Sequence, residues 1–415
     1  MSVKLTSEEI RLLELIAGSF NENKKRADHH GADPSRVLNL ATCHAIAPII
    51  YDLLKEEELS TDDRAMLESS VMETASKFFK LLFLARDTIR ILEEGGVSVI
   101  LLKGASVASL YPVPEYRRSS DVDLLLADPA DVFTAGEILA ASGYRLMHDD
   151  YEANHHQTWG SPNNHVIELH TTLVEPFDNR SLNSYINTRY LLGGDDIRRL
   201  NIMGADLPVF FDDRQALHLM LHMMMDFYRS GFGLKLLCDW VVFWNRILEP
   251  KYIETFIKDV RSCHAMAFLS VITSSCIRYL GLKSDKSCSL YIQDDKICYQ
   301  GGSFCEYLDE NICLEFLSDV IDAERHGKPD ATRMVAMKKA GLGGLIKEYH
   351  HQTVLSFPKA SRAIITLPFL YLVMLIRFLK NNRTTRGGIS TRDIIDESMK
   401  RSRMIKRIED SCKDP

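Results

Sequence analysis

The sequence lacks a C-x-x-C pair, internal repeats, low-complexity tracts and any apolar run long enough to span a bilayer. Its nine cysteines are odd in number and irregularly spaced, which argues against a disulfide framework and a structural zinc ribbon. The 50 Lys and Arg against 57 Asp and Glu give a net charge of −7, which argues against a globally basic nucleic-acid binder, and no DNA partner is expected. With no signal-peptide core at the N-terminus, we expect a cytoplasmic protein.

Composition and length indicate an ordinary folded protein with more than one unit. Hydrophobic residues make up 46% and charged residues 26% of the chain, proportions that fit neither disorder, collagen nor a coiled coil. At 415 residues the chain exceeds one typical core of roughly 100–200 residues. We expect an N-terminal helical region at 1–95, an α/β core at 96–212, a helical domain at 213–360, and a hydrophobic helix with a basic tail at 361–415.

Helical spacing of apolar residues dominates the N-terminal region. Ser7 predicts the N-cap of a first helix, and apolar residues recur every three or four positions from Leu67 to Leu92 in a longer one. We expect the longer helix to stop at Gly95 and Gly96, because glycine tolerates the left-handed conformation at a helix end.

The pattern then changes to strands that alternate with helices. Short apolar or alternating runs predict strands at 97–102, 121–126 and 165–170, and proline and glycine flank a predicted helix at 129–142. Beyond residue 213 the spacing is helical again. Two stripes there are predicted to be core, namely Ala216, Leu217, Met220, Leu221 and Met224, and Leu236, Leu237, Trp240, Val241 and Trp244.

The most hydrophobic stretch, residues 363–376, is shorter than the ~20 residues that span a bilayer, and Pro368 interrupts it. A buried helix is the first interpretation, and a helix on a membrane surface or on a partner is the alternative. The tail from Arg377 onward carries more Lys and Arg than Asp and Glu, which favours either a solvated basic face or an anionic contact such as lipid headgroups or RNA. Peripheral membrane contact through 363–380 is therefore a further hypothesis.

The segment at 101–126 carries residues suited to phosphate chemistry. A strand ends in Lys103 and Gly104, and glycine lets the backbone approach a ligand closely. A helix that starts near Ala105 would offer free N–H groups to phosphate, with Ser106 as a further hydroxyl donor.

A pair of carboxylates follows in the same segment. Asp121 and Asp123 lie two residues apart on the predicted strand, so both side chains leave the same face. Hard oxygen ligands suit Mg²⁺, which proteins hold with one or two carboxylates plus substrate phosphates. Arg117 and Arg118, just upstream, can neutralise further phosphate charge.

A third carboxylate would hold a second metal and draw the proton from an acceptor hydroxyl. Glu168 is the candidate, because its phase in the strand at 165–170 puts it on one face with His170. Two metals about 3.5–4 Å apart would then align attacking and leaving oxygens for in-line displacement at phosphorus.

These pieces together resemble a known family. The run L-K-G-x-x…Y-P…R-x-S-x-D-x-D-L-L, then I-E-L-H and later L-H-L-x-L-H…D, is similar to the bacterial family of uncharacterised nucleotidyltransferases within the polymerase-β-like superfamily. In this sequence the pieces are Leu102 to Gly104, Tyr111 and Pro112, Arg117 to Leu125, Ile167 to His170, Leu217 to His222, and Asp239. The resemblance covers residues 95–244.

The resemblance implies an α/β (α+β) fold in which helical domains flank a small mixed-sheet core on its N-terminal and C-terminal sides. It implies transfer of a nucleoside monophosphate from an NTP such as ATP to a hydroxyl or phosphate acceptor, with release of pyrophosphate. Asp121, Asp123 and Glu168 would be the catalytic residues and would bind two Mg²⁺ ions, with Mn²⁺ as the alternative. The sequence departs from the superfamily's Gly-Gly or Gly-Ser pair, because Ala105 follows Gly104.

Further polar residues are assigned to binding. Nucleotide binding is assigned to Lys103, Gly104, Ser106, Arg117, Ser119, Lys235 and Asp239, and acceptor contact to His170, His218 and His222. Lys235 and Asp239 are one helical turn apart, so they either form an ion pair or belong to a helix laid over the nucleotide. Leu219 stands where the zinc signature H-E-x-x-H needs glutamate, so packing or acceptor contact is favoured over zinc at the last two histidines.

Two other classes of protein use similar features. Glycosyltransferases also hold a divalent cation on a nucleotide-sugar with D-x-D, but there the pair closes an apolar strand, whereas here it opens one. A regulator that binds nucleotide without turnover is the non-enzymatic alternative. The acceptor stays open among a small metabolite, a sugar, a peptide product and RNA.

Overall fold

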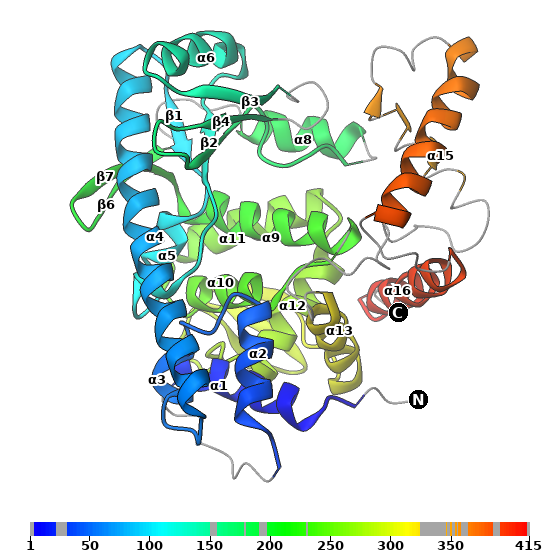
Figure 1. The fold of residues 1–415 in the computed structure, drawn as a ribbon. Helices are drawn as coiled ribbons and strands as arrows, with labels where there is room; N and C mark the ends of the chain where they lie inside the picture. Colours follow the sequence, from blue (N-terminus) through cyan, green and yellow to red (C-terminus); the bar gives the residue numbers. More distant parts are fainter. Residues whose placement is uncertain are drawn as a thin grey trace.

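The computed structural model describes residues 4–21, 31–149, 156–177, 180–190, 197–229, 231–323, 364–384 and 391–412, with isolated positions between 346 and 357. It is a mixed α/β protein in which helices flank a small five-stranded mixed sheet (Figure 1). The fold class expected from the sequence is therefore confirmed. The division into parts at residues 95, 212 and 360 stays a prediction.

Four helices precede the sheet. They are α1 (Ser7–Phe20), α2 (Pro34–Cys43), α3 (Tyr51–Leu54) and the long α4 (Thr61–Glu94), which runs along one side of the molecule in Figure 1. The cap of α1 is Thr6 instead of Ser7, because the Thr6 hydroxyl accepts from the N–H of Glu9 while the Glu9 carboxylate accepts from the N–H of Thr6. The predicted end of α4 is confirmed at its C-cap, Gly95.

The central sheet has the strand order β1-β2-β5-β4-β3, with β2 and β5 parallel and the other pairs antiparallel. The strands are β1 (Val99–Leu101), β2 (Val122–Leu126), β3 (Arg145–Asp149), β4 (His156–Gly160) and β5 (Val166–His170). The sequence predicted β1, β2 and β5. It missed β3 and β4, whose polar side chains and short length give no apolar run.

Short elements and a hairpin surround this sheet. They are α5 (Ala105–Ala108), η1 (Pro114–Tyr116), η2 (Pro129–Asp131), α6 (Val132–Ala141), α8 (Arg180–Tyr190), β6 (Ile197–Ile202) and β7 (Ala205–Phe210). The predicted helix at 129–142 corresponds to η2 and α6. The phosphate-facing helix expected after Gly104 is a single turn, α5.

Helices dominate the rest of the described chain, but a second sheet interrupts them. The helices are α9 (Asp212–Arg229), α10 (Leu234–Trp244), α11 (Pro250–Ser262), α12 (Met266–Tyr279), α13 (Glu310–Ala323), η5 (Ile364–Thr366), α15 (Leu367–Thr384) and α16 (Thr391–Asp410). The second sheet comprises β8 (Tyr291–Gln293), β9 (Lys296–Tyr299) and β10 (Gly302–Glu306). The sequence predicted only helices here, because these short strands lie between turns.

The two faces of the central sheet join different apolar cores. Val122, Leu124 and Leu126 of β2 pack with the C-terminal half of α4. Leu125, on the opposite face, belongs to the larger core that also contains α9 and α10. Asp123 shares the face of Leu125, so its carboxylate points towards the helical part of the chain. Both stripes predicted on α9 and α10 lie in this larger core.

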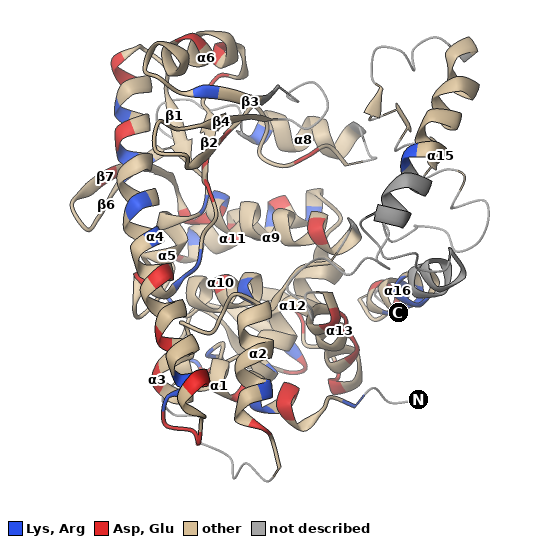
Figure 2. Cartoon of the chain, in the orientation of Figure 1, with Lys and Arg blue, Asp and Glu red and all other residues tan. Residues whose placement is uncertain are grey.

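The buried helix predicted at 363–376 is wrong in its burial. Helix α15 stands away from the sheet and from α9 (Figure 1), and its ribbon carries no charged residue over its first turns (Figure 2). Ile365 is 90% exposed, Phe369 68% and Ile376 57%, whereas Leu370 is buried. Pro368 does not interrupt the helix, because it lies in the first turn, where its missing N–H costs no hydrogen bond.

Candidate active site

The parallel pair β2 and β5 brings two of the three predicted acids together. Asp123 lies directly beside Glu168 in the register of these strands, although 45 positions separate them in the sequence. His170 follows on the same face of β5, and its Nε2 lies 3.2 Å from Asp123 Oδ1 and 3.4 Å from Glu168 Oε2. Ligand atoms of these three residues all lie within 4.8 Å of one another.

Asp121 lies just before β2, two residues from Asp123, and is not a member of that cluster. Its carboxyl still lies in the same electrostatic environment. Burial raises the pKa of Asp121, and the neighbouring charges of Asp123 and Glu168 raise it further, while Lys103 opposes them. The predicted acids therefore face one region, with Asp123 at its centre.

Lys103 provides the cation beside this centre. Its Nζ lies 3.6 Å from Asp123 Oδ2 and donates to His222 Nε2 at 3.0 Å. The other ring nitrogen of His222 lies 3.2 Å from Asp226 Oδ2, one turn along α9. The ammonium is thus held between a buried carboxylate of the sheet and an imidazole of the helix.

The protonation states follow from these contacts. Burial works against the charge of Asp123, but Lys103 and His170 outweigh it and hold the pKa of this carboxyl well below its usual range. Burial likewise opposes the charge of Lys103, yet Asp123 and Asp121 raise its pKa. Burial and the adjacent Lys103 lower the pKa of His222 well below its usual value. The site therefore holds an ionised Asp123, a charged Lys103 and a neutral His222.

The Gly104 turn follows directly after Lys103. Gly104 has φ 65° and ψ −117°, a conformation that residues with a Cβ rarely adopt. The side chain of Ser106 is buried, and its hydroxyl donates to the carbonyl of Lys103 at 3.3 Å. The turn itself requires glycine at position 104, and the hydrogen bond from Ser106 stabilises this turn. Contact of either residue with phosphate stays a prediction.

A buried ion pair links the loop before β2 to α10. Arg117 donates from Nε and Nη2 to the two carboxylate oxygens of Asp239, both at 2.7 Å, and Tyr111 donates to Asp239 Oδ1 at 2.6 Å. Arg117 Nη1 also donates to Ser119 Oγ at 2.8 Å, next to the predicted acids. This bidentate geometry is the strong form of an arginine–carboxylate pair.

Of the two alternatives for Lys235 and Asp239, the ion pair between them does not form, and the helix laid over the nucleotide stays a prediction. The Asp239 carboxylate pairs with Arg117, and Lys235 Nζ donates to the carbonyl of Arg118 at 3.4 Å. Burial, together with the charge of Arg117, lowers the pKa of Lys235 to about 8. Nucleotide contact by Lys235, Asp239, Arg117 and Ser119 stays a prediction.

His218 lies one turn before His222 on α9, with ring centroids 6.2 Å apart. It is 1% exposed, and burial and then the charge of Lys103 lower its pKa to about 3. A neutral, buried imidazole of this kind fits packing behind Lys103. Acceptor contact by His170, His218 and His222 remains untested.

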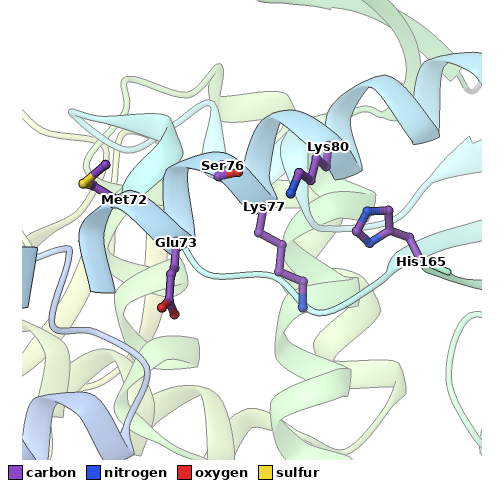
Figure 3. Close-up of a pocket in the computed structure, with 6 residues that line it drawn as sticks. All are labelled: Met72, Glu73, Ser76, Lys77, Lys80 and His165. Carbon is purple, nitrogen blue, oxygen red and sulfur yellow. The ribbon is translucent and has the colours of Figure 1, made fainter. Parts of the chain in front are cut away.

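A separate open pocket of about 390 Å³ lies between α4 and the start of β5 (Figure 3). It is lined by Met72, Glu73, Ser76, Lys77, Lys80 and His165. Figure 3 shows the side chains of Lys77, Lys80 and His165 around one space. Ile167, two residues after His165, packs in the core with α4, so the pocket lies on the sheet face opposite the cluster around Asp123.

The donor set of the cluster fits a divalent cation. Asp123 is 2% exposed and Glu168 26%, so two carboxylates meet where water screens their repulsion poorly. Two carboxylates and an imidazole are established ligand types for divalent ions. The three atoms lie close enough to face one ion.

Sequence reasoning missed two residues of this region, Asp226 and His156. Asp226 had a readable signal, because it lies four residues after His222 on a helix. His156 had none, since it reaches Glu168 Oε1, at 3.9 Å, only through the pairing of β4 with β5.

Comparison with known proteins adds a family to this geometry. No curated protein matches the chain. Among solved structures, an antigenic nucleotidyltransferase-like protein from Paracoccidioides brasiliensis matches with a TM-score of 0.34 and 17% identity, covering 49% of this chain and 93% of that one. A likeness at this level adds nothing to the assignment.

The family comparison is more informative. The model described as uncharacterised nucleotidyltransferase matches residues 30–281, more than half of the chain. This span includes β1, β2, β5, α9 and α10, and therefore every residue of the cluster and every partner that holds it. The chain therefore belongs to the family of uncharacterised nucleotidyltransferases.

Proposed function

We propose that this protein transfers a nucleoside monophosphate from an NTP, such as ATP, to a hydroxyl or phosphate acceptor, with release of pyrophosphate. Family membership supports a general nucleotidyltransferase function. The single observation that carries the proposal is the cluster of Asp123, Glu168 and His170 on one sheet face, with Asp121 two residues away.

We assign the residues separate tasks. Asp121, Asp123 and Glu168 would hold two divalent cations, Mg²⁺ or Mn²⁺, which would supply positive charge for the triphosphate and the attacking oxygen. Lys103 adds a fixed cation beside Asp123. The Gly104 turn brings backbone near the phosphates, and Arg117 keeps the loop before β2 in place through Asp239.

The transfer requires one base, which removes the proton of the acceptor hydroxyl. The acceptor oxygen forms a bond to the α-phosphorus, the bond from that phosphorus to the leaving oxygen breaks, and pyrophosphate departs with the electron pair. Glu168 and Asp123 both belong to the cluster, but the Glu168 side chain is 26% exposed and that of Asp123 only 2%. Glu168 can therefore reach an incoming acceptor. We assign removal of the acceptor proton to Glu168.

The first test uses labelled NTPs, Mg²⁺ and a panel of acceptors that includes sugars, phosphosugars, peptides and RNA. We expect metal-dependent release of pyrophosphate and label transfer to one acceptor class. Glu168→Gln should keep NTP binding and lose transfer. Tight NTP binding without turnover across the panel would favour the regulator, and turnover of a UDP-sugar without pyrophosphate release would favour a glycosyltransferase.

A second proposal concerns the C-terminal helices of the described chain. We propose that η5 and α15 contact an anionic membrane surface from the side of Ile365, Phe369, Leu372 and Ile376. These positions follow one another at intervals of three or four, and each is 53–90% exposed. Basic side chains are exposed on α16, at Lys400, Arg403 and Lys406, and complement anionic lipid. None of the helices in the described part of the chain has the length and apolar character needed to span a bilayer.

Vesicle sedimentation tests this contact. We expect the protein to sediment with vesicles of phosphatidylcholine and phosphatidylglycerol, and Phe369→Ser with Leu372→Ser to weaken binding about tenfold or more, because each exposed side chain gains apolar burial in the interface. Phe133→Ser, which changes a 64% exposed phenylalanine on α6, is the matched control. Equal binding by both variants, or no sedimentation of the native protein, would refute the contact.

A further inference from the structure

The position of His170 gives the proposed metal site a ligand that the sequence assigned to acceptor contact. Residues 168 and 170 leave β5 on the same side, because side chains alternate along a strand. The Nε2 atom of His170 lies 3.2 Å from Asp123 Oδ1 and 3.4 Å from Glu168 Oε2. The imidazole therefore reaches both carboxylates from one ring nitrogen.

The 3.2 Å contact with Asp123 is a hydrogen bond, and both spacings also match those of neighbouring ligands around a single ion, which would take the place of the proton on Nε2. Mg²⁺ binds oxygen at about 2.0–2.1 Å in octahedral geometry, which separates adjacent ligand atoms by roughly 3 Å. The atoms of Asp123, Glu168 and His170 all lie within 4.8 Å of one another, and two of their separations are close to that value. Small side-chain movements would suffice to turn all three towards one cation.

Surrounding contacts keep the donors in place. Lys103 approaches the other oxygen of Asp123, Oδ2, at 3.6 Å, so Oδ1 remains directed at His170. The side chain of His170 is only 8% exposed. The ring of His156 lies 5.1 Å from that of His170, which limits the rotation of the imidazole. The proposed metal site therefore combines one nitrogen ligand, already in position, with two carboxylates, and so differs from a site made of oxygen ligands alone.

We infer that His170 is a direct ligand of the cation held by Asp123 and Glu168, and that this nitrogen makes the site prefer Mn²⁺ to Mg²⁺. The inference rests on the proposed function only in that Asp123 and Glu168 bind a cation. Mg²⁺ favours oxygen ligands and dehydrates reluctantly, whereas first-row transition ions bind imidazole nitrogen more readily. His170 then acts on the metal and not on the acceptor.

The test measures Mn²⁺ itself by electron paramagnetic resonance, in the full-length protein, with and without a non-hydrolysable NTP analogue. Bound Mn²⁺ should show hyperfine coupling to one imidazole nitrogen in pulsed spectra. His170→Ala should remove this coupling and weaken Mn²⁺ binding about tenfold or more, since even supporting residues around a metal contribute 10–100-fold. Mg²⁺ should displace Mn²⁺ less readily from the native protein than from His170→Asn, whose side chain offers an oxygen ligand in place of the imidazole nitrogen.

His165→Ala is the matched control, because this histidine lines the pocket on the opposite face of the sheet and is not a member of the cluster. It should leave the nitrogen coupling intact. Circular dichroism and thermal unfolding of each variant identify any that fail to fold. Mn²⁺ that binds, depends on Asp123 and shows no nitrogen coupling would overturn the inference while leaving the proposed function in place. Absence of Mn²⁺ binding with and without the analogue would overturn both.

Discussion

Asp123→Asn should reduce kcat/KM for nucleotidyl transfer by about 10³-fold or more, since losing several kcal/mol of charge stabilisation costs tenfold for each 1.36 kcal/mol. Asparagine keeps the shape of the side chain and removes its charge. Asp123 is the residue on which the contacts converge, because His170 approaches one carboxylate oxygen and Lys103 the other. Pyrophosphate release at saturating metal, with the thermal midpoint measured in parallel, checks this expectation.

The matched control is Glu137→Gln, which removes an equal charge from an exposed carboxylate on α6. It should leave transfer unchanged. Retention of more than a tenth of the native rate by Asp123→Asn would contradict the assignment. Asp123→Asn should also lose Mn²⁺ binding. This loss would show that the variant is inactive because it lacks the metal, and not because the assay contains the wrong acceptor.

Asp239→Ala should lower the free energy of unfolding by about 3–5 kcal/mol, the usual cost of leaving one member of a buried ion pair without its partner. Arg117 is 3% exposed and Asp239 1%, so water cannot replace the lost contact. Tyr111 loses its acceptor as well. Urea unfolding followed by circular dichroism measures the change.

Two further variants show whether charge is the cause. Arg117→Met with Asp239→Leu removes both charges and should recover most of the lost stability, because apolar replacement of a buried pair is often close to neutral. Asp206→Ala breaks the exposed pair with Arg199, where the side chains are 47% and 55% exposed, and should cost about 1 kcal/mol or less. A similar loss in Asp239→Ala and Asp206→Ala would show that burial does not matter here.

Local signals in the sequence were sufficient for the elements nearest the site. The apolar run at 97–102 and the alternation at 165–170 correspond to β1 and β5, and the glycine pair at 95–96 marks the end of α4. The alternation of side chains along a single strand predicted that Glu168 and His170 share one face. The distance of 3.4 Å between Glu168 Oε2 and His170 Nε2 confirms this prediction.

Contacts between distant segments could not be predicted in the same way. The pairing of Asp123 with Glu168 depends on β2 lying parallel to β5, which no local pattern specifies. Arg117 and Asp239 are 122 positions apart, and the helical spacing of Asp239 pointed instead to Lys235. The burial of α15 was predicted from hydrophobicity alone, which does not reveal whether a neighbouring surface exists to cover it.

The attachment of the site to α9 and α10 limits which parts of this protein can be exchanged on their own. His222 and Asp239, which hold Lys103 and Arg117, come from those helices and not from the sheet that carries the acids. The strands alone therefore do not form a transplantable module. A sheet exchanged without α9 and α10 would leave Lys103 without the His222 imidazole and Arg117 without the Asp239 carboxylate, so the sheet and these two helices work as one unit.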